Sequence, residues 1–268
     1  MKIARILTPS GKTEYISPTS ETTGNILSGS IKEGFTPTSE STEIASYLSP
    51  LDPPCIFCVG QNYREHALEL GNSIPELPLI FIKSPNTLNH QGGNIEIPKR
   101  LESTKVDYEA ELAVVIGKRT KNVSLENALN HVFGYTIAND VTARDWQKEF
   151  GQGQFCQGKS FDTFCPLGPY IVSADELTNP QNLQLQTQLN GEVMQNGNTS
   201  DMIFSVARLI EFLSGSKTLL PGTLILTGTP SGVGAGRNPS VFLKKGDEVT
   251  VTIETIGALN NPVIEEPL

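Results

Sequence analysis

Histidine, cysteine, tryptophan and long apolar runs are all scarce in this chain of 268 residues, which has three histidines, four cysteines and one tryptophan. No apolar stretch approaches the roughly 18 residues that a membrane-spanning helix needs, so we expect no membrane partner. Lysine and arginine form no basic tract, and the net charge is -9. Because nucleic acids favour basic surfaces, the sequence argues against a nucleic-acid partner. What remains is a globular composition, with 37% hydrophobic residues available for a core.

The few cysteines do not form a recognisable metal or redox motif. Cys55 and Cys58 make a C-x-x-C inside the apolar segment "CIFCVG", but no second C-x-x-C or C-x-x-H follows. We therefore interpret them as core thiols. The first residues, "MKIARILTPSGK", lack the cleavage pattern of a signal peptide. Both observations favour a reducing, cytoplasmic setting.

Short apolar segments separated by turns make up most of the chain, which contains 24 glycines and 18 prolines. Segments such as "PLIFIK", "ELAVVIG" and "TLILTGTP" predict an α+β, mostly β fold with a rolled or barrel-like core. Hydrophobic spacing and end signals predict a few helices. We expect them at residues 62–71, 124–132, 141–150 and 200–214.

The first part of the chain differs in composition from the rest. It is rich in serine, threonine and glutamate, and "SPLDPP" at residues 49–54 is a natural boundary. We therefore predict a small N-terminal β subdomain at residues 1–53 and a main domain at residues 54–268.

The segment "DYEAELAVVIG", residues 107–117, reads as a strand that carries two acids. Glu109 and Glu111 point the same way because side chains alternate along a strand. Both faces are apolar further along, which predicts a strand buried inside a sheet. Two like charges in a core repel each other and are costly to desolvate. Either the pair is solvated at a sheet edge, or one acid is protonated, or a cation lies between them.

A third acid, Asp140, follows the strand-like "YTIAN". It could cap a helix, although Thr142 with Asp145 offers a competing capping box. On such a helix, Arg144 and Gln147 would share the face of Asp140. Together with the two glutamates, Asp140 would complete an all-oxygen set of ligands. Such a set suits Mg²⁺, Mn²⁺ or Ca²⁺, whereas zinc prefers histidine and cysteine.

Other polar residues are candidates for acid–base or anion chemistry. His66 and Glu69, three apart in "NYREHALELG", form either a solvated helix face or a base with its orienting acid. Lys159 would by residue type alone be a surface lysine. Thr229 lies in the glycine-rich "TGTPSGVG", whose backbone N–H groups could hold an anion. Lys83, after "PLIFI", is a weaker candidate.

Several of these segments together resemble the fumarylacetoacetate hydrolase (FAH) family. The matching segments, in order and spacing, are "DYEAELAVVIG", "GYTIANDVTARDWQ", "GKSFDTFCPLGP" and "LTGTPSGVG". The resemblance covers about residues 54–265 and implies an FAH-type β-roll for the main domain. It also implies that Glu109, Glu111 and Asp140 hold Mg²⁺ or a similar ion.

The resemblance gives roles to the remaining candidates. It implies that His66 and Glu69 lie on a segment, residues 62–75, that closes over the ligand. It implies that Lys159 stabilises developing negative charge, and that Arg144 and Gln147 contact carboxylate and carbonyl groups of the substrate. FAH-like proteins usually form dimers, so we expect a homodimer.

The predicted function is a divalent-metal-dependent hydrolase that cleaves a C–C bond of a β-diketo acid of the acylpyruvate or fumarylpyruvate type. Water activated by His66 and Glu69 would attack, and a metal-stabilised enolate would leave. One alternative is an oxaloacetate decarboxylase or tautomerase, or a hydroxymuconate-type isomerase, on the same site. Another is a non-catalytic protein that binds a metal and a 2-oxo acid, because a fold does not fix a function.

Overall fold

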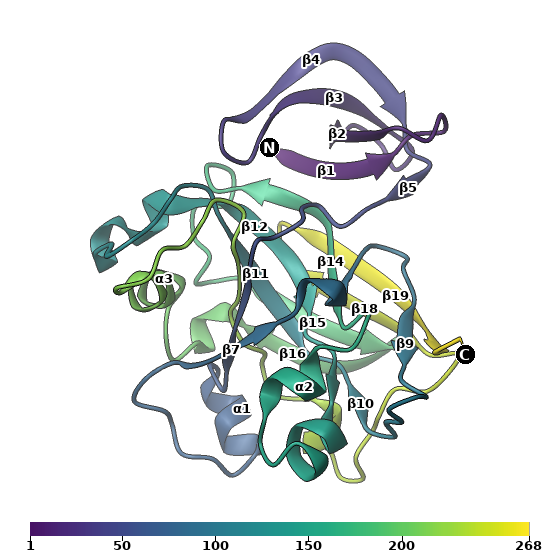
Figure 1. Ribbon diagram of the computed structural model, residues 1–268, viewed down its shortest axis with the longest axis vertical. Coiled ribbons are helices and arrows are strands. Elements are labelled where there is room, and N and C mark those ends of the chain that lie inside the picture. The colour runs from purple at the N-terminus through teal and green to yellow at the C-terminus, as the bar shows by residue number, and fades with distance from the viewer. Residues whose placement is uncertain (268) are drawn as a thin grey trace.

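The computed structural model describes residues 1–267, which form a mostly β structure with a few short helices, as predicted (Figure 1). The main sheet has the order β4-β3-β2-β1-β14-β12-β11-β17-β6-β7, and β5 and β8 pair beside β1 and β14. Its strands are β1 (Lys2–Leu7), β2 (Thr13–Pro18), β3 (Thr23–Ser30), β4 (Gly34–Glu43), β5 (Ser46–Tyr47), β6 (Ile56–Gly60), β7 (Leu79–Lys83), β8 (Leu88–Asn89), β11 (Ala110–Ile116), β12 (Val132–Asn139), β14 (Cys165–Ser173) and β17 (Leu224–Leu226).

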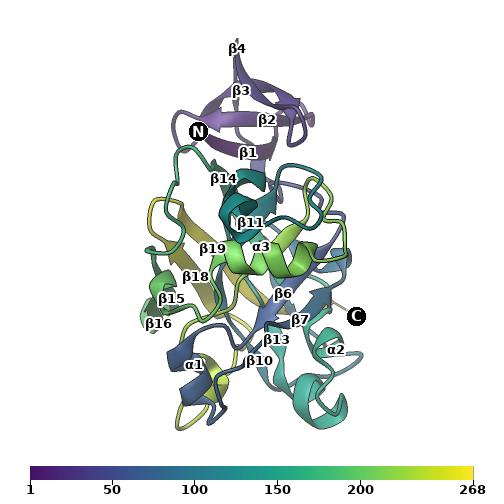
Figure 2. The same cartoon turned by 90° about the vertical axis from the view of Figure 1, so that its left-hand side faces the viewer.

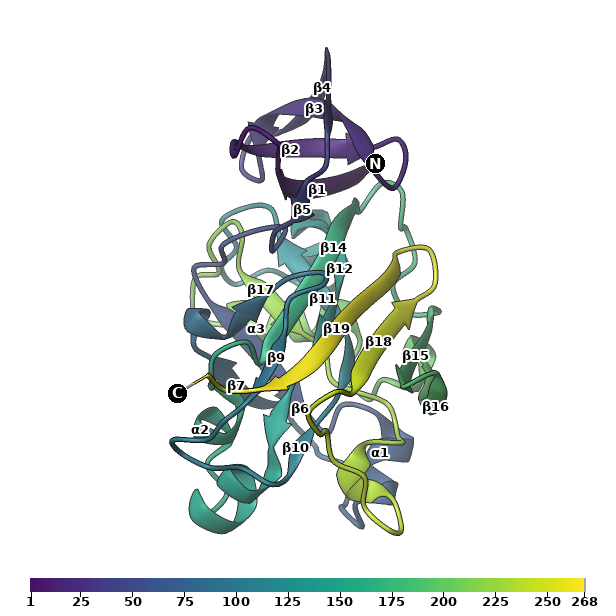
Figure 3. The ribbon, with the colours of Figure 1, turned by 90° about the vertical axis from the view of Figure 1, so that its right-hand side faces the viewer.

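A second sheet lies beside the first, with the order β16-β15-β18-β19-β9 (Figure 3). Its strands are β9 (Ile95–Ile97), β15 (Gln184–Leu189), β16 (Glu192–Asn198), β18 (Glu248–Ile253) and β19 (Gly257–Glu265). The short strands β10 (Val106–Asp107) and β13 (Thr142–Ala143) pair separately. An apolar cluster that contains Leu112 of β11 and Val251 of β18 fills the space between the sheets. Among residues 1–267, neither sheet closes into a barrel.

Strand β11 lies inside the main sheet, between β12 and β17, and all of its residues are buried. Leu112 and Val114 belong to the cluster between the two sheets. Ala113 and Val115 belong to a separate cluster, which also contains Ile56 of β6. The prediction of an interior strand, buried on both faces, is therefore confirmed.

Strands β1 to β5 form the end of the molecule that lies farthest from helix α1 (Arg64–Glu69) (Figure 2). They enclose a small apolar cluster of Ala4, Ile6 and Ile16. Strand β1 also pairs with β14, so the main sheet continues into this end. The division at residues 53 and 54 stays a prediction.

The helices are shorter than predicted. They are α1, α2 (Phe155–Lys159), α3 (Val206–Ser214), the 3₁₀ segments η1 (Pro85–Thr87), η2 (Leu125–His131), η4 (Thr199–Asp201) and η5 (Gly234–Gly236), and the π-helix η3 (Asp145–Phe150). Helices α1 and α3 lie within two predicted ranges, and the range 124–132 holds a 3₁₀ segment. No helix among residues 1–267 is long and apolar enough to cross a membrane.

The helix predicted at residues 141–150 begins later than predicted and is a π-helix. Thr142 and Ala143 form β13, which pairs with β10, and only then does the π-helix η3 begin. The β-branched pair Val141 and Thr142 favours a strand, and the β10–β13 pairing stabilises it. Asp140 therefore does not share an α-helical face with Arg144. The capping box is also wrong, because the Asp145 carboxylate accepts hydrogen bonds from Ser103 and Thr104.

Candidate active site

Three buried carboxylates converge where β11 begins and β12 ends. In the pairing of β11 with β12, Ala110 lies opposite Asn139. Glu109, which precedes Ala110, and Asp140, which follows Asn139, therefore lie side by side just beyond this pair. The backbone N–H of Asp140 donates to the carbonyl of Glu109 at 2.9 Å. One oxygen from each of Glu109, Glu111 and Asp140 lies within 4.8 Å of the others. The structure thus brings the predicted ligands together, and their role in holding a metal stays a prediction.

Two buried lysines compensate part of this negative charge. Lys159 Nζ lies 2.8 Å from Glu109 Oε2, 2.6 Å from Asp140 Oδ2 and 2.7 Å from Thr142 Oγ1. Lys83 Nζ lies 2.6 Å from Asp140 Oδ1. Burial lowers the pKa of Lys159, but Asp140 and Glu109 outweigh it, so the pKa is raised and the ammonium stays charged. Lys83 contacts Asp140 from the side away from the cavity that is described below, because it is not among the described residues that line that cavity.

The two glutamates differ in electrostatic environment. Burial would raise the pKa of Glu109, but Lys159 and Arg144 outweigh it and lower the pKa to about 2. Glu111 makes no ion pair among the described residues, and its Oε2 accepts one hydrogen bond, from Gly228 N at 2.6 Å. Burial, then Asp140 and Glu109, raise the pKa of Glu111 well above its usual range. Glu111 is the acid that lacks a counter-charge.

This donor set fits a hard divalent cation. It consists of carboxylate oxygens, it is buried, and it leaves one acid without a counter-charge. A cation here would relieve the repulsion that raises the pKa of Glu111. Mg²⁺, Mn²⁺ and Ca²⁺ prefer such oxygen ligands, whereas this cluster contains neither the cysteine nor the histidine that zinc prefers.

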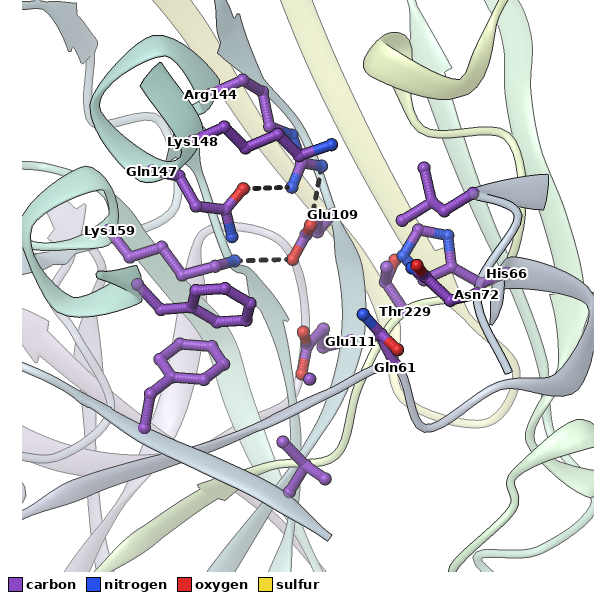
Figure 4. Close-up of a pocket in the computed structure, with 15 residues that line it drawn as sticks. Gln61, His66, Asn72, Glu109, Glu111, Arg144, Gln147, Lys148, Lys159 and Thr229 are labelled. Carbon is purple, nitrogen blue, oxygen red and sulfur yellow. Dashed lines mark hydrogen bonds and ion pairs between the residues drawn. The ribbon is translucent and has the colours of Figure 1, made fainter. Parts of the chain in front are cut away.

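A cavity of about 250 Å³ opens above the carboxylates. Figure 4 shows Arg144, Gln147, Lys148 and Lys159 on one side of the glutamates, with His66, Asn72 and Thr229 on the other. The side chains that line it are Val59, Gln61, His66, Leu70, Asn72, Phe81, Glu109, Glu111, Arg144, Gln147, Lys148, Phe155, Lys159 and Thr229, together with Gly60. The cavity thus has an acidic floor and one basic wall.

His66 faces this cavity from α1 and is 4% exposed. Its Nδ1 lies 3.0 Å from Glu69 Oε2, so Nε2 remains free to exchange a proton. The predicted contact between the histidine and its orienting acid is confirmed, while its catalytic role stays a prediction. The predicted mobility of residues 62–75 also stays a prediction.

The glycine-rich loop after β17 binds carboxylates of the protein itself. Besides Gly228, the N–H of Gly232 donates to Glu69 Oε1 at 2.8 Å, and the N–H of Gly234 donates to Asp107 Oδ1 at 2.8 Å. Thr229 Oγ1 accepts from Gln195 at 2.8 Å, which leaves the hydroxyl proton for the cavity that Thr229 lines. The loop does cradle anions, as predicted, but the anions seen are acids that shape the site.

The guanidinium of Arg144 is occupied by protein groups. Nε pairs with Asp107 Oδ2 at 2.8 Å, Nη2 lies 2.7 Å from Glu109 Oε1, and Nη1 donates to Gln147 Oε1 at 3.2 Å. Its contact with a substrate carboxylate therefore stays a prediction. Asp107 was not predicted as a site residue, although it stands two residues before Glu109 in the sequence, a spacing that places both side chains on one face of an extended segment. Sequence analysis also missed Lys148 and Asn72, for which the sequence carries no signal.

Residues 55–264 match the family described as Fumarylacetoacetate (FAA) hydrolase C-terminal. The chain belongs to the FAH family. It is 49% identical over 219 residues to "Oxaloacetate tautomerase YisK" of Bacillus subtilis, a match that covers 80% of this chain and 72% of that protein. It is 48% identical over 220 residues to "Oxaloacetate tautomerase fahd2, mitochondrial" of Xenopus laevis, covering 82% and 68%.

Solved structures agree with the family. A 2-hydroxyhepta-2,4-diene-1,7-dioate isomerase of Mycobacterium marinum is 37% identical, superposes with a TM-score of 0.86 and covers 100% of both chains. A 5-carboxymethyl-2-hydroxymuconate delta-isomerase of Mycobacterium smegmatis is 36% identical, with a TM-score of 0.87, and covers 99% of this chain and 100% of its own. This chain is therefore an enzyme of the FAH family.

The lack of a side chain at Gly236 leaves room for Glu69 in this FAH-family site. A Cβ at residue 236 would lie 2.5 Å from Glu69 Cδ, closer than packed atoms approach. We expect Gly236→Ala to displace Glu69 and to lower kcat about 10- to 100-fold, the cost of losing an orienting contact. Gly215→Ala is the control, because Gly215 is exposed at the end of α3. Equal kcat values in Gly236→Ala and wild type would show that Glu69 need not stay in this position.

Proposed function

We propose that this FAH-family enzyme catalyses the enol–keto tautomerisation of oxaloacetate or of a closely related 2-oxo dicarboxylate. One observation carries the proposal: His66 faces three converging carboxylates across a small cavity, with Nδ1 held by Glu69. Tautomerisation needs a metal-binding end for the 2-oxo acid and one base near C3, which this arrangement supplies. The names of the Bacillus subtilis and Xenopus laevis relatives support the same reaction.

Glu109, Glu111 and Asp140 would hold a divalent cation at the floor of the cavity. When bound, the cation would act as a Lewis acid toward the carboxylate and keto oxygens of the substrate and so acidify the hydrogens on C3. Mg²⁺ is the cation we propose, and the carboxylate donor set supports a hard divalent ion of this kind.

The residues of the chain itself would move and position the proton. His66 Nε2 takes a proton from C3 of the keto form while Glu69 fixes the ring, and the C2 oxygen gains a proton from solvent to give the enol. In the reverse direction the enol oxygen releases its proton to solvent and His66 returns a proton to C3. Thr229 Oγ1 and Gln147 Nε2 remain available as donors to substrate oxygens, because their acceptor atoms are engaged by Gln195 and Arg144. Lys159 holds Glu109 and places a positive charge beside the oxygens that gain negative charge.

Hydrolysis of a C–C bond in an acylpyruvate or fumarylpyruvate is the second candidate. The contact between His66 and Glu69 favours it, because a histidine fixed by a carboxylate can also take a proton from water. The names of the two mycobacterial structures add a third candidate reaction, isomerisation of a hydroxymuconate-like diacid, which like tautomerisation moves a proton. All three reactions would use the same acidic floor and the same base.

A substrate panel separates tautomerisation from hydrolysis. Purified protein with Mg²⁺ is offered enol oxaloacetate, acetylpyruvate and fumarylpyruvate, with Mg²⁺ alone as the control for uncatalysed tautomerisation. Absorbance follows enol loss and cleavage, and released CO₂ is measured separately to detect decarboxylation. We expect rapid conversion of enol oxaloacetate to the keto form without release of CO₂. Cleavage of either diketo acid, with no effect on enol oxaloacetate, would replace tautomerisation by hydrolysis.

From the family resemblance we also propose a homodimer that works in the cytoplasm. The relatives named above include a bacterial protein and a mitochondrial one, so localisation can differ within the family. Light scattering of the purified protein tests the dimer, and a monomer mass at micromolar concentration would contradict it.

A further inference from the structure

Lys148 is the one cation at the cavity that makes no ion pair among the described residues. Arg144, Lys148 and Lys159 all line the cavity. Arg144 is paired with Asp107 and Glu109, and Lys159 with Glu109 and Asp140. The side chain of Lys148 is exposed and lines the same cavity, so it stands at the mouth. Its charge is available to a ligand.

The π-helix η3 fixes where Lys148 stands. Arg144, Gln147 and Lys148 are spaced by three and four residues, and Figure 4 shows them on the same wall. The helix is anchored at its start by Asp145, which accepts from Ser103 Oγ at 2.7 Å, and by the Trp146 indole, which donates to a backbone carbonyl at 3.0 Å. These contacts therefore fix the backbone position from which Lys148 reaches the mouth of the cavity.

Gln147 supplies a second donor on this wall. Its Oε1 accepts from Arg144 Nη1 at 3.2 Å, which orients the side-chain amide and leaves the NH₂ group as a donor. In Figure 4 this NH₂ group points toward Lys159, whereas the side chain of Lys148 extends along Arg144, so Lys148 is the cation left at the mouth.

The charge of the site explains why a dicarboxylate would need a cation at the mouth. The floor is acidic, and the chain as a whole carries a net charge of -9. The divalent metal ion proposed at the floor would compensate the charge of the substrate carboxylate next to the 2-oxo group. A second carboxylate would point away from the floor, toward the mouth, where repulsion by the protein would otherwise oppose it.

We propose that Lys148 recognises the second carboxylate of the substrate and makes the site prefer dicarboxylic over monocarboxylic 2-oxo acids. This inference rests on the proposed function for the orientation of the substrate, with its 2-oxo acid end at the acidic floor. Lys148 would thus select the substrate, and the proton transfer would remain with His66.

Two unreactive ligands of equal chain length test this preference without turnover. L-malate and 2-hydroxybutyrate share a 2-hydroxy acid end. At the other end L-malate has a carboxylate, and 2-hydroxybutyrate has a methyl group. Calorimetry with Mg²⁺-saturated protein gives both dissociation constants. We expect wild type to bind L-malate more tightly, by about two- to fivefold from the Lys148 contact, as for an exposed charge pair. Lys148→Met removes that factor for L-malate and leaves 2-hydroxybutyrate unchanged, whereas Lys148→Arg keeps it.

The control is Lys121→Met, which removes an exposed lysine that is not part of the cavity. It should leave both dissociation constants unchanged. An unaltered preference for L-malate in Lys148→Met, an equal loss for both ligands, or no preference in wild type would each overturn the inference. Because the readout is binding, a wild-type enzyme that binds L-malate through Lys148 but does not tautomerise oxaloacetate would contradict only the proposed function.

Discussion

Replacing His66 by asparagine will slow the enol–keto conversion of oxaloacetate about 10²- to 10⁴-fold, the usual contribution of a positioned acid–base group. The asparagine amide can still donate to Glu69 from the position of Nδ1, but it has no base at the position of Nε2. The wall that carries His66 lies opposite the acidic floor, so the affinity for Mg²⁺ should not change. Stopped-flow absorbance gives the rate, and calorimetry gives the affinity.

Glu69→Gln is the matched variant for this prediction. It keeps an acceptor for Gly232 and a side chain of the same length, but it removes the charge that orients His66. We expect a loss about 10- to 100-fold, smaller than in His66→Asn. Full activity in His66→Asn would exclude His66 as the base.

Replacing Glu111 by glutamine will abolish metal-dependent activity and at the same time raise the thermal stability of the metal-free protein. Glu111 is buried beside Asp140 and Glu109 and makes no ion pair among residues 1–267. Glutamine keeps an oxygen that can accept from Gly228 and removes a buried charge that its surroundings disfavour. Thermal unfolding with and without Mg²⁺ measures both effects.

Wild type and Glu111→Gln should therefore respond to Mg²⁺ in different ways. Wild type should gain stability with Mg²⁺ because an ion that binds only the folded state shifts the unfolding equilibrium. Glu111→Gln should show no such gain. Asp162→Asn is the control, because Asp162 is an exposed acid outside the cluster. A metal-free Glu111→Gln protein that melts below wild type would contradict the charge imbalance at Glu111.

The parts of the site that sequence analysis predicted depend on local periodicity. Glu109 and Glu111 share a face because side chains alternate along a strand, and a short antiparallel pairing then brings Asp140 beside them. The same periodicity predicts the two apolar faces of β11. The contact of His66 with Glu69 follows from a spacing of three residues on a helix.

The parts that it missed depend on contacts between distant segments. The start of the helix predicted after Asp140 is replaced by β13 because residues 142 and 143 pair with β10, which no local pattern announces. Arg144 turns to Asp107 and Glu109 because β10 and the start of β11 present both acids to it. Lys148 lies at the cavity on a π-helix that contacts with residues 102–104 anchor.

The central claim is that a cation held by Glu109, Glu111 and Asp140 is needed for tautomerisation. A titration of chelator-treated protein with Mg²⁺ tests it most directly, with the rate of enol oxaloacetate loss and the bound ion measured in the same samples. We predict that the protein-catalysed rate is absent without Mg²⁺, rises in proportion to the bound ion and saturates at a single ion per chain, and that Glu111→Gln shows neither binding nor rate. A full rate in the chelated protein, or an unchanged affinity for Mg²⁺ in Glu111→Gln, would contradict the account.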